Sequence, residues 1–268
     1  QLNSSLVTNS TKFLRIMDMA SVELGGYELR YDTGSVYVTK NFFALLGAPE
    51  VDGSSLTVRT FGELLEHIQL ARPCTVNAEG DKVLTVVQGG RTRYIMLRVT
   101  TEDRVQVGLA EDVTAATQER LRIERDFLSL CASEPSIGLA YAGALAQTVW
   151  HRDIHGQIAM QLLDVLAEDA AAPAAEIVRR LEESIPGAAS VISGSSTHDD
   201  REPGELARFF SEELAIRDME DLIREMNAQL KRPQDMSADD YNLVFESVVA
   251  MQKELAAAKL AHKPFGIE

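Results

Sequence analysis

The stretch that decides the fold covers residues 25–47 and reads GGYELRYDTGSVYVTKNFFALLG. Short alternating or apolar runs flank Asp32-Thr33-Gly34, and such runs are typical of strands. Glycine tolerates the positive φ that a tight hairpin needs. From Phe42 the pattern changes, and adjacent aromatic and leucine residues favour a short helix. The stretch therefore predicts a β-hairpin followed directly by a helix.

Further runs of the same kind extend this pattern into a sheet. Candidate strands cover residues 27–31, 35–39, 82–87, 92–99 and 104–110. Gly89-Gly90 and a turn around Asp103 connect the last three. Between the second and third strands, apolar residues recur at helical spacing around Phe42 and again around Phe61. Helices grouped inside an antiparallel sheet predict an α+β domain whose helices cover one sheet face.

The rest of the chain has a helical pattern. A lead-in helix is expected near the N-terminus, and the second half is expected to be mainly helical. Candidate helices in the second half cover residues 115–131, 138–168, 174–185, 203–230 and 237–262. Residues 188–196 are also compatible with a short strand. The predicted organisation is a lead-in helix at 1–20, a sheet domain at 21–114, a connector helix at 115–131 and an output domain at 132–268.

Composition narrows the classes of partner. The 268 residues carry a net charge of −15, which would repel nucleic acids and anionic membranes. No apolar run reaches the length of about 18 residues that a membrane span requires. The two cysteines have no metal-binding spacing. We expect a cytoplasmic protein without direct membrane contact. Because the chain begins with Gln1, membrane attachment of a longer parent protein stays open.

Two motifs together resemble the two ends of a PAS domain. Residues 25–47 are similar to its opening hairpin and aromatic helix, and residues 105–114, VQVGLAEDVT, are similar to its last strand and terminal Asp-x-Thr signature. The resemblance implies a five-stranded antiparallel sheet whose inner face holds a small molecule or is filled by side chains. It also implies a bacterial-type signalling protein that senses, dimerises or does both.

The resemblance also suggests ligand-pocket residues. The candidates are Tyr27, Leu29, Phe42, Phe43, Leu46, Met96 and Val107. His67 is the only histidine of this domain, and a lone histidine is more often structural or exposed than a haem ligand. Cys74 does not lie in the sequence context that flavin photochemistry requires. We therefore predict no cofactor, and an unidentified small-molecule ligand remains an alternative.

The connector has the spacing of a coiled coil. Its candidate seam consists of Ala116, Arg120, Ile123, Phe127 and Leu130, which step by four, three, four and three. Pairing of two such helices predicts a homodimer through the PAS domain and the connector. A single surface helix is the alternative. In the dimer, the expected signal-relay residues are Asp112, Thr114, Ile123 and Phe127.

The second half allows several interpretations. Residues 122–130 faintly resemble the entry to a GGDEF domain, but Ala144-Leu145-Ala146 replaces the metal-binding Asp-x-Asp. Phosphoryl transfer without those carboxylates lacks its main charge stabilisation, so cyclase activity is not expected. His155 is a weak candidate phosphoacceptor of a histidine-kinase dimerisation helix. His151 and His155 are four residues apart, as in a metal pair, although surface histidines are favoured and no metal site is predicted.

The last two candidate helices carry apolar stripes. They most simply form a helical hairpin, and the alternative is a partner-binding surface. The leading hypothesis is a non-catalytic regulatory protein in which a PAS domain passes its state through the connector to a protein-binding helical domain. The alternative is a fragment of a PAS-linked signalling enzyme, either a GGDEF relative or a kinase dimerisation region.

Overall fold

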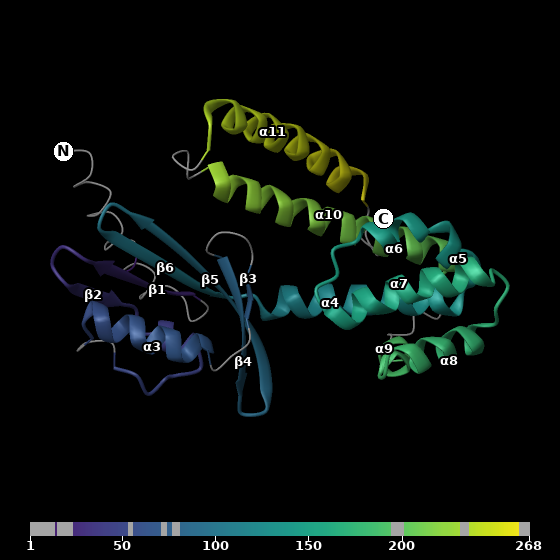
Figure 1. The fold of residues 1–268 in the computed structure, drawn as a ribbon, viewed down its shortest axis with the longest axis horizontal. Helices are drawn as coiled ribbons and strands as arrows, with labels where there is room; N and C mark the ends of the chain where they lie inside the picture. The colour runs from purple at the N-terminus through teal and green to yellow at the C-terminus, as the bar shows by residue number, and fades with distance from the viewer. Residues whose placement is uncertain are drawn as a thin grey trace. The chain divides into compact units, whose positions relative to one another are not determined.

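The computed structural model describes residues 14, 24–52, 56–70, 74–76, 81–193, 201–230 and 236–262. The chain divides into two compact units, Gln1–Thr117 and Gln118–Glu268 (Figure 1). The predicted lead-in helix lies outside the described residues except for Leu14, which is helical and buried.

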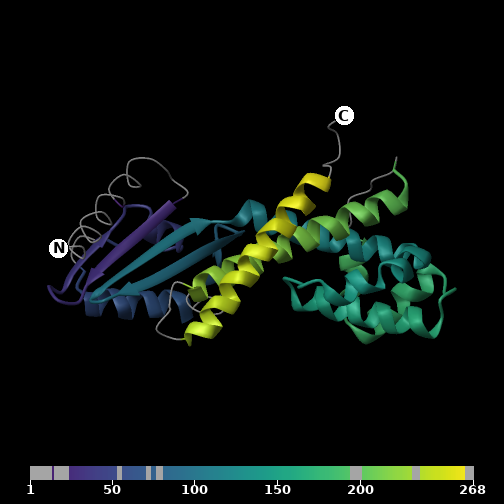
Figure 2. The ribbon, with the colours of Figure 1, turned by 90° about the horizontal axis from the view of Figure 1, so that it is seen from above.

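The first unit is built on an antiparallel sheet with the strand order β2-β1-β6-β5-β4-β3. Its strands are β1 (Leu24–Arg30), β2 (Ser35–Val38), β3 (Cys74–Val76), β4 (Asp81–Gln88), β5 (Arg91–Glu102) and β6 (Val105–Asp112). Helices α2 (Phe42–Leu45) and α3 (Val58–Leu70) belong to the same unit, and α3 lies alongside the sheet (Figures 1 and 2). The predicted α+β class is confirmed, with helices grouped between strands of one antiparallel sheet as the sequence predicts.

All five predicted strands are present, and the sixth was missed. Strand β3 contains only three residues, which pair with β4 from Cys74 opposite Leu84 to Val76 opposite Lys82. Three residues are too few to show a period of two, so the sequence gives no strand signal there.

The tight turns contain the residues that the sequence indicates. Gly34, Gly89 and Gly90 have φ values of 69°, 58° and 75°, and Asp103 has a φ of 51°. Three of these four positions are glycine, which adopts positive φ without a Cβ clash. The hairpin turns thereby fix the register of β1 with β2, β4 with β5 and β5 with β6.

In the second unit, the described residues form helices and no strand. The helices are α4 (Thr114–Ser133, which begins in the first unit), α5 (Pro135–Ala140), α6 (Ala142–Gln147), α7 (Asp153–Glu168), α8 (Ala174–Ser184), α9 (Ala188–Ser193), α10 (Pro203–Leu230) and α11 (Ala238–Ala261). The strand alternative is wrong for Ala188–Ser193, while residues 194–196 lie outside the described part. Asp153 is the first residue of α7, so this part of the unit is helical as well. The faint GGDEF resemblance therefore gains no support.

The single helix predicted at 138–168 is also wrong, because the chain forms α5, α6 and α7 there. Thr148 and Arg152 have extended backbones, with ψ of 132° and 134°. Between them, the amides of Val149 and His151 donate to the side chains of Asp218 and Glu124, at 3.0 Å each. Carboxylates from distant helices thus replace the helical hydrogen bonds of this segment.

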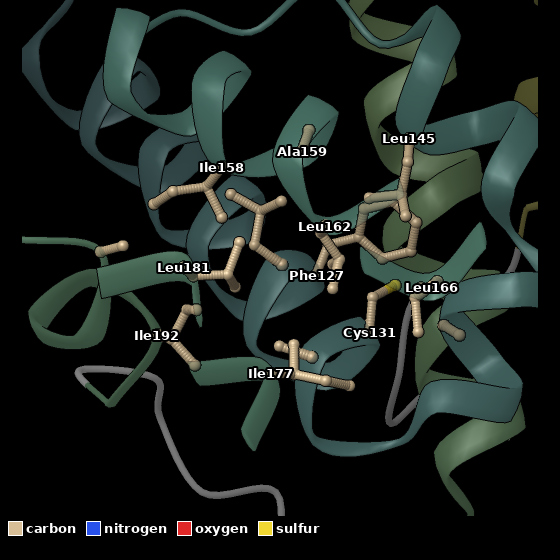
Figure 3. Packing of buried hydrophobic residues seen from close by; sticks show 14 of the residues in the cluster. Phe127, Cys131, Leu145, Ile158, Ala159, Leu162, Leu166, Ile177, Leu181 and Ile192 are labelled. Atoms are coloured by element: carbon tan, nitrogen blue, oxygen red, sulfur yellow. The ribbon is translucent and has the colours of Figure 1, made fainter. Parts of the chain in front are cut away.

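The core of the second unit joins α4 to α6, α7, α8, α9 and α10. Figure 3 shows Phe127 and Cys131 of α4 beside Leu162 of α7, with Leu145, Ile177 and Leu181 from neighbouring helices. Burial raises the pKa of the Cys131 thiol to about 12, so the thiol stays protonated and packs as a small apolar group. None of the described helices is both long and apolar enough to cross a membrane.

The predicted hairpin of the last two helices is present, with α10 and α11 side by side (Figures 1 and 2). Ser237 caps α11 by accepting a hydrogen bond from the Asp240 amide, as the capping-box pattern indicates. Ion pairs join the helices at the other end. The Lys259 amine lies 2.5 Å from Glu220, and His262 lies 3.0 Å from both Glu212 and Glu213.

The first prediction concerns Gly108 on β6. A Cβ at this position would lie 2.0 Å from the Tyr27 ring, so Gly108→Ala should overpack the buried face and destabilise the sheet by about 1–3 kcal/mol. A matched control is Gly62→Ala on α3, where a Cβ meets nothing within 4 Å and a helical alanine should stabilise by about 0.5–1 kcal/mol. Thermal unfolding followed by circular dichroism measures both. Equal midpoints for the two variants would contradict the packing described.

Candidate functional site

The inner face of the sheet holds a cluster of aromatic side chains. The Tyr27 ring lies 4.6 Å from Phe61 and 5.2 Å from Phe42, measured between centroids. All three side chains are fully buried. Edge and tilted ring contacts of this kind add to the hydrophobic effect of burial. Tyr27 donates a hydrogen bond to the Gln106 side chain at 3.2 Å, and burial raises the Tyr27 pKa, so its hydroxyl stays protonated.

Five of the seven proposed pocket residues meet in this cluster. Tyr27 and Leu29 come from β1, while Phe42 and Phe43 come from α2 and Leu46 directly follows it. Residues that the sequence analysis did not name complete the cluster: Leu45, Ala48, Phe61, Leu84, Val86, Ile95, Leu97 and Ala110. These side chains fill the inner face. Of the two alternatives, a ligand-holding face or a filled one, the described residues match the filled one.

Met96 and Val107 were assigned to the wrong face. Ile95 and Leu97 belong to the inner cluster, and side chains alternate along a strand, so Met96 between them lies on the opposite face. Val107 pairs with Glu28, whereas the neighbouring pair, Tyr27 and Gly108, is on the inner side. His67 is exposed on α3, outside the cluster.

The junction between β6 and α4 is fixed by side-chain hydrogen bonds. The Thr114 amide donates to Asp112 at 2.9 Å, and the Thr114 hydroxyl accepts from the Tyr94 amide of β5 at 2.8 Å. The Val113 amide donates to the Tyr94 carbonyl at 2.9 Å. Two of the predicted relay residues, Asp112 and Thr114, therefore attach the first residue of α4 to the central strands.

About three turns further on, α4 contributes a buried carboxylate to the second unit. Glu124 is 0% exposed. It accepts hydrogen bonds from His155 Nδ1 at 2.7 Å, from the His151 amide at 3.0 Å and from Arg120 Nε at 3.1 Å. These partners come from α7, from the segment before it and from α4 itself. A buried carboxylate needs such partners, because an unpaired charge in the interior is strongly destabilising.

Arg120 extends this polar cluster to α10. Its guanidinium pairs with Asp218 and donates to the Val149 carbonyl at 2.7 Å, while Asp218 also accepts from the Val149 amide at 3.0 Å. Asp221 lies 4.0 Å from the same guanidinium. We call Arg120, Glu124, His151, His155 and Asp218 the buried polar cluster, after its three buried members Arg120, Glu124 and His155; Asp218 is partly exposed and His151 lies at the exposed edge. It joins α4, α7, α10 and the 148–152 segment.

The geometry corrects the expectation for His155. A phosphoacceptor needs an exposed imidazole, but His155 is 2% exposed and its Nδ1 is bound to Glu124. His151 and His155 both turn toward the same carboxylate, with His151 Nδ1 3.5 Å and His155 Nδ1 2.7 Å from Glu124. Among the described residues, no three acidic, histidine or cysteine side chains form a metal-binding group.

The connector seam is occupied within the chain. Arg120, Ile123 and Phe127 are buried, and Ile123 and Phe127 belong to the core of the second unit together with residues of α7 and α10. Leu130 packs against the same core, whereas Ala116 is exposed. The spacing therefore marks an intrachain packing face over most of its length, and the expected coiled-coil pairing through this seam is not available. Whether the protein dimerises elsewhere is a separate question.

The buried polar cluster shifts the acid–base behaviour of two of its members. Burial alone raises the pKa of Glu124, but hydrogen bonds from His155 and from the His151 amide outweigh burial, and the net pKa lies below the ordinary 4.5. Burial lowers the pKa of His151 below 6.5, and the charge of Arg120 lowers it further. The folded state therefore favours a charged Glu124 beside a neutral His151.

The second prediction tests the buried polar cluster by substitution. Glu124→Ala removes the acceptor of three donors and leaves Arg120 with fewer counter-charges, so we expect a loss of about 3 kcal/mol or more. Trp150, the single tryptophan, lies next to the cluster, and its fluorescence in urea reports this unit. The matched control, Glu183→Ala, removes one partner of an exposed ion pair with Arg179 and should leave the midpoint nearly unchanged. A comparable loss in both variants would show that burial of Glu124 is unimportant.

The third prediction is a pH dependence of the same transition. A group whose pKa is lower in the folded state stabilises the fold above its ordinary pKa and loses this contribution as the pH falls toward the folded value. The urea midpoint should thus be constant above the ordinary pKa of His151, 6.5, and fall first below it and again below that of Glu124, 4.5. His151→Gln should remove the first decline and retain the second. A midpoint that rises on acidification would contradict both pKa shifts.

Comparisons with known proteins add little to this description. No family model matches the chain, and no curated protein sequence is similar enough to count as a relative. Among solved structures, one described as an RNA-binding light-oxygen-voltage receptor is 16% identical and covers 69% of this chain, with a TM-score of 0.21. The match spans 63% of that structure, just under two thirds of its length. Similarity at this level does not assign a function, which has to be argued from the residues themselves.

Proposed function

We propose that this chain is a sensory and regulatory module in which the PAS-like unit passes its conformational state through α4 to the helical unit, which acts by binding a protein partner. The single observation that carries the proposal concerns α4, which is one uninterrupted helix. Side-chain hydrogen bonds hold this helix at its first residue and again at the end of its first three turns. Thr114 is bonded to the central sheet, and Arg120 and Glu124 are bonded inside the second unit.

A helix attached in this way is suited to transmit small displacements. Strand β5 holds Thr114 through the Tyr94 amide and Val113 through the Tyr94 carbonyl, and it is also a wall of the aromatic cluster, through Ile95 and Leu97. A change in that cluster would therefore act on the start of α4. At Glu124, the same helix carries hydrogen bonds that keep the 148–152 segment extended. Packed elements with directional bonds tend to switch between discrete arrangements instead of deforming continuously.

The filled inner face favours relay over capture of a bulky ligand. Three fully buried aromatic rings pack together on this face, and the Tyr27 ring lies where a side chain at 108 would be. A signal would then come from repacking of this cluster or from association of the unit with another protein. A homodimer formed outside the packed connector seam and a partner of the C-terminal helices both remain part of this proposal.

The fourth prediction tests the relay. Thr114→Val removes the hydroxyl that accepts from the Tyr94 amide, so the start of α4 should loosen and the effect should reach the hydrogen bonds at Glu124. Hydrogen exchange measured by mass spectrometry should be about fivefold faster or more at the amides of Val149 and His151. The matched control is Thr100→Val. Thr100 is an exposed threonine on β5, the strand that contains Tyr94.

The control variant should leave exchange at residues 148–152 unchanged. If Thr114→Val accelerates exchange only in the sheet, the two attachments of α4 act independently and the relay is wrong. Retention of the wild-type Trp150 unfolding midpoint checks that the second unit is still folded in the variant.

A further inference from the structure

Helix α11 has a largely apolar stripe, interrupted by Gln252, whose residues are exposed except for the half-buried Val249. Phe245, Val249, Gln252 and Ala256 step by four, three and four along the helix, the spacing of a seam between two helices. Phe245 is 51% exposed, and Leu260, which continues the stripe, is 88% exposed. The face toward α10 is a different one, centred on Val248, the only buried residue that the structure describes on α11.

Two opposite charges flank this stripe, and neither has a partner among the described residues. Glu246 and Lys253 are both exposed, and neither forms an ion pair with another residue in the described part of the chain. They are seven residues apart on one flank of the stripe, about 10 Å along the axis, which is too far for pairing within one helix. Unlike Asp239 and Asp240 in the first turn or Lys259 in the last, they lie in the helix interior, where the helix dipole does not explain their placement.

We propose that α11 pairs with α11 of a second copy of this chain in an antiparallel arrangement. A two-fold axis near the middle of the stripe places Phe245 opposite Ala256 of the second copy and Val249 opposite Gln252. The largest side chain of the stripe then meets the smallest. The same alignment brings Glu246 close to Lys253 of the second copy, twice by symmetry. Parallel pairing would instead place the flank with Glu246 and Lys253 beside the opposite flank of the second copy, so the two charges would not meet.

An isologous two-fold contact of this kind uses the same patch on both copies. It does not depend on the relay through α4, because none of its residues belongs to the buried polar cluster or to the β6–α4 junction. It also replaces the connector as the surface for self-association, since the connector seam is packed within the chain.

The experiment is a charge-reversal series on the full chain, read by light scattering after gel filtration over a range of concentrations. Wild-type protein should dimerise. Glu246→Lys and Lys253→Glu should each weaken the dimer by about tenfold or more, because two attractive contacts per dimer become repulsive. Mixing the two variants should restore a dimer, since every flank contact is again between opposite charges. Glu254→Lys makes the same charge change on another face of α11 and should dimerise like wild type.

Each other outcome contradicts the proposal. A wild-type monomer at all concentrations would mean that no second copy covers the stripe. A dimer that survives both single reversals would be formed through another surface. Failure of the mixture to associate would exclude the antiparallel alignment. Circular dichroism and Trp150 fluorescence of each variant establish that it is folded, so failure here is distinct from failure of the relay, which is read by hydrogen exchange.

Discussion

The second unit depends on the burial of one charged group, the carboxylate of Glu124. A carboxylate with no exposed surface is tolerated only when donors surround it, and the donors here come from α4, α7 and the segment between α6 and α7. Meeting this requirement sets the position of α7 relative to α4. It also explains why the chain leaves the helical conformation at residues 148–152, since the His151 amide is used for Glu124 and the Val149 amide for Asp218.

The first unit depends on a different constraint, the alternation of side chains across the sheet. Gly108 has no side chain where Tyr27 of the neighbouring strand needs space, so the ring lies flat over β6 and reaches Phe42 and Phe61. The hairpins could be predicted from the sequence because turns and alternation are local signals. Met96 and Val107 were placed on the wrong face because only strand pairing, which is not local, decides which residues share a face. Strand β3 was too short to carry any signal.

The candidate site in the second unit could be predicted only in part. His155 stands out in the sequence, but the acid that binds it is Glu124, 31 residues away. Arg120 pairs with Asp218 across 98 residues. No periodicity connects such positions. A usable signal was available in α4: Arg120 and Glu124 are four residues apart in line with Ile123 and Phe127, which places charges on an apolar face and indicates a buried polar contact.

That signal bears on how a helical seam should be interpreted. A stripe of apolar residues with steps of four and three indicates that one face of a helix packs against another element. It does not indicate whether that element belongs to the same chain or to a partner. In α4 the stripe contains an arginine and lies beside a glutamate, and both find partners in the same chain, so the cover is intramolecular. In α11 the flanking charges, Glu246 and Lys253, have no described partner and match their own copies in antiparallel order. Charges beside a seam thus distinguish the two cases. A charge that becomes buried when a helix packs must find an ion-pair partner, and the position of that partner shows whether the packing helix belongs to the same chain or to a second copy.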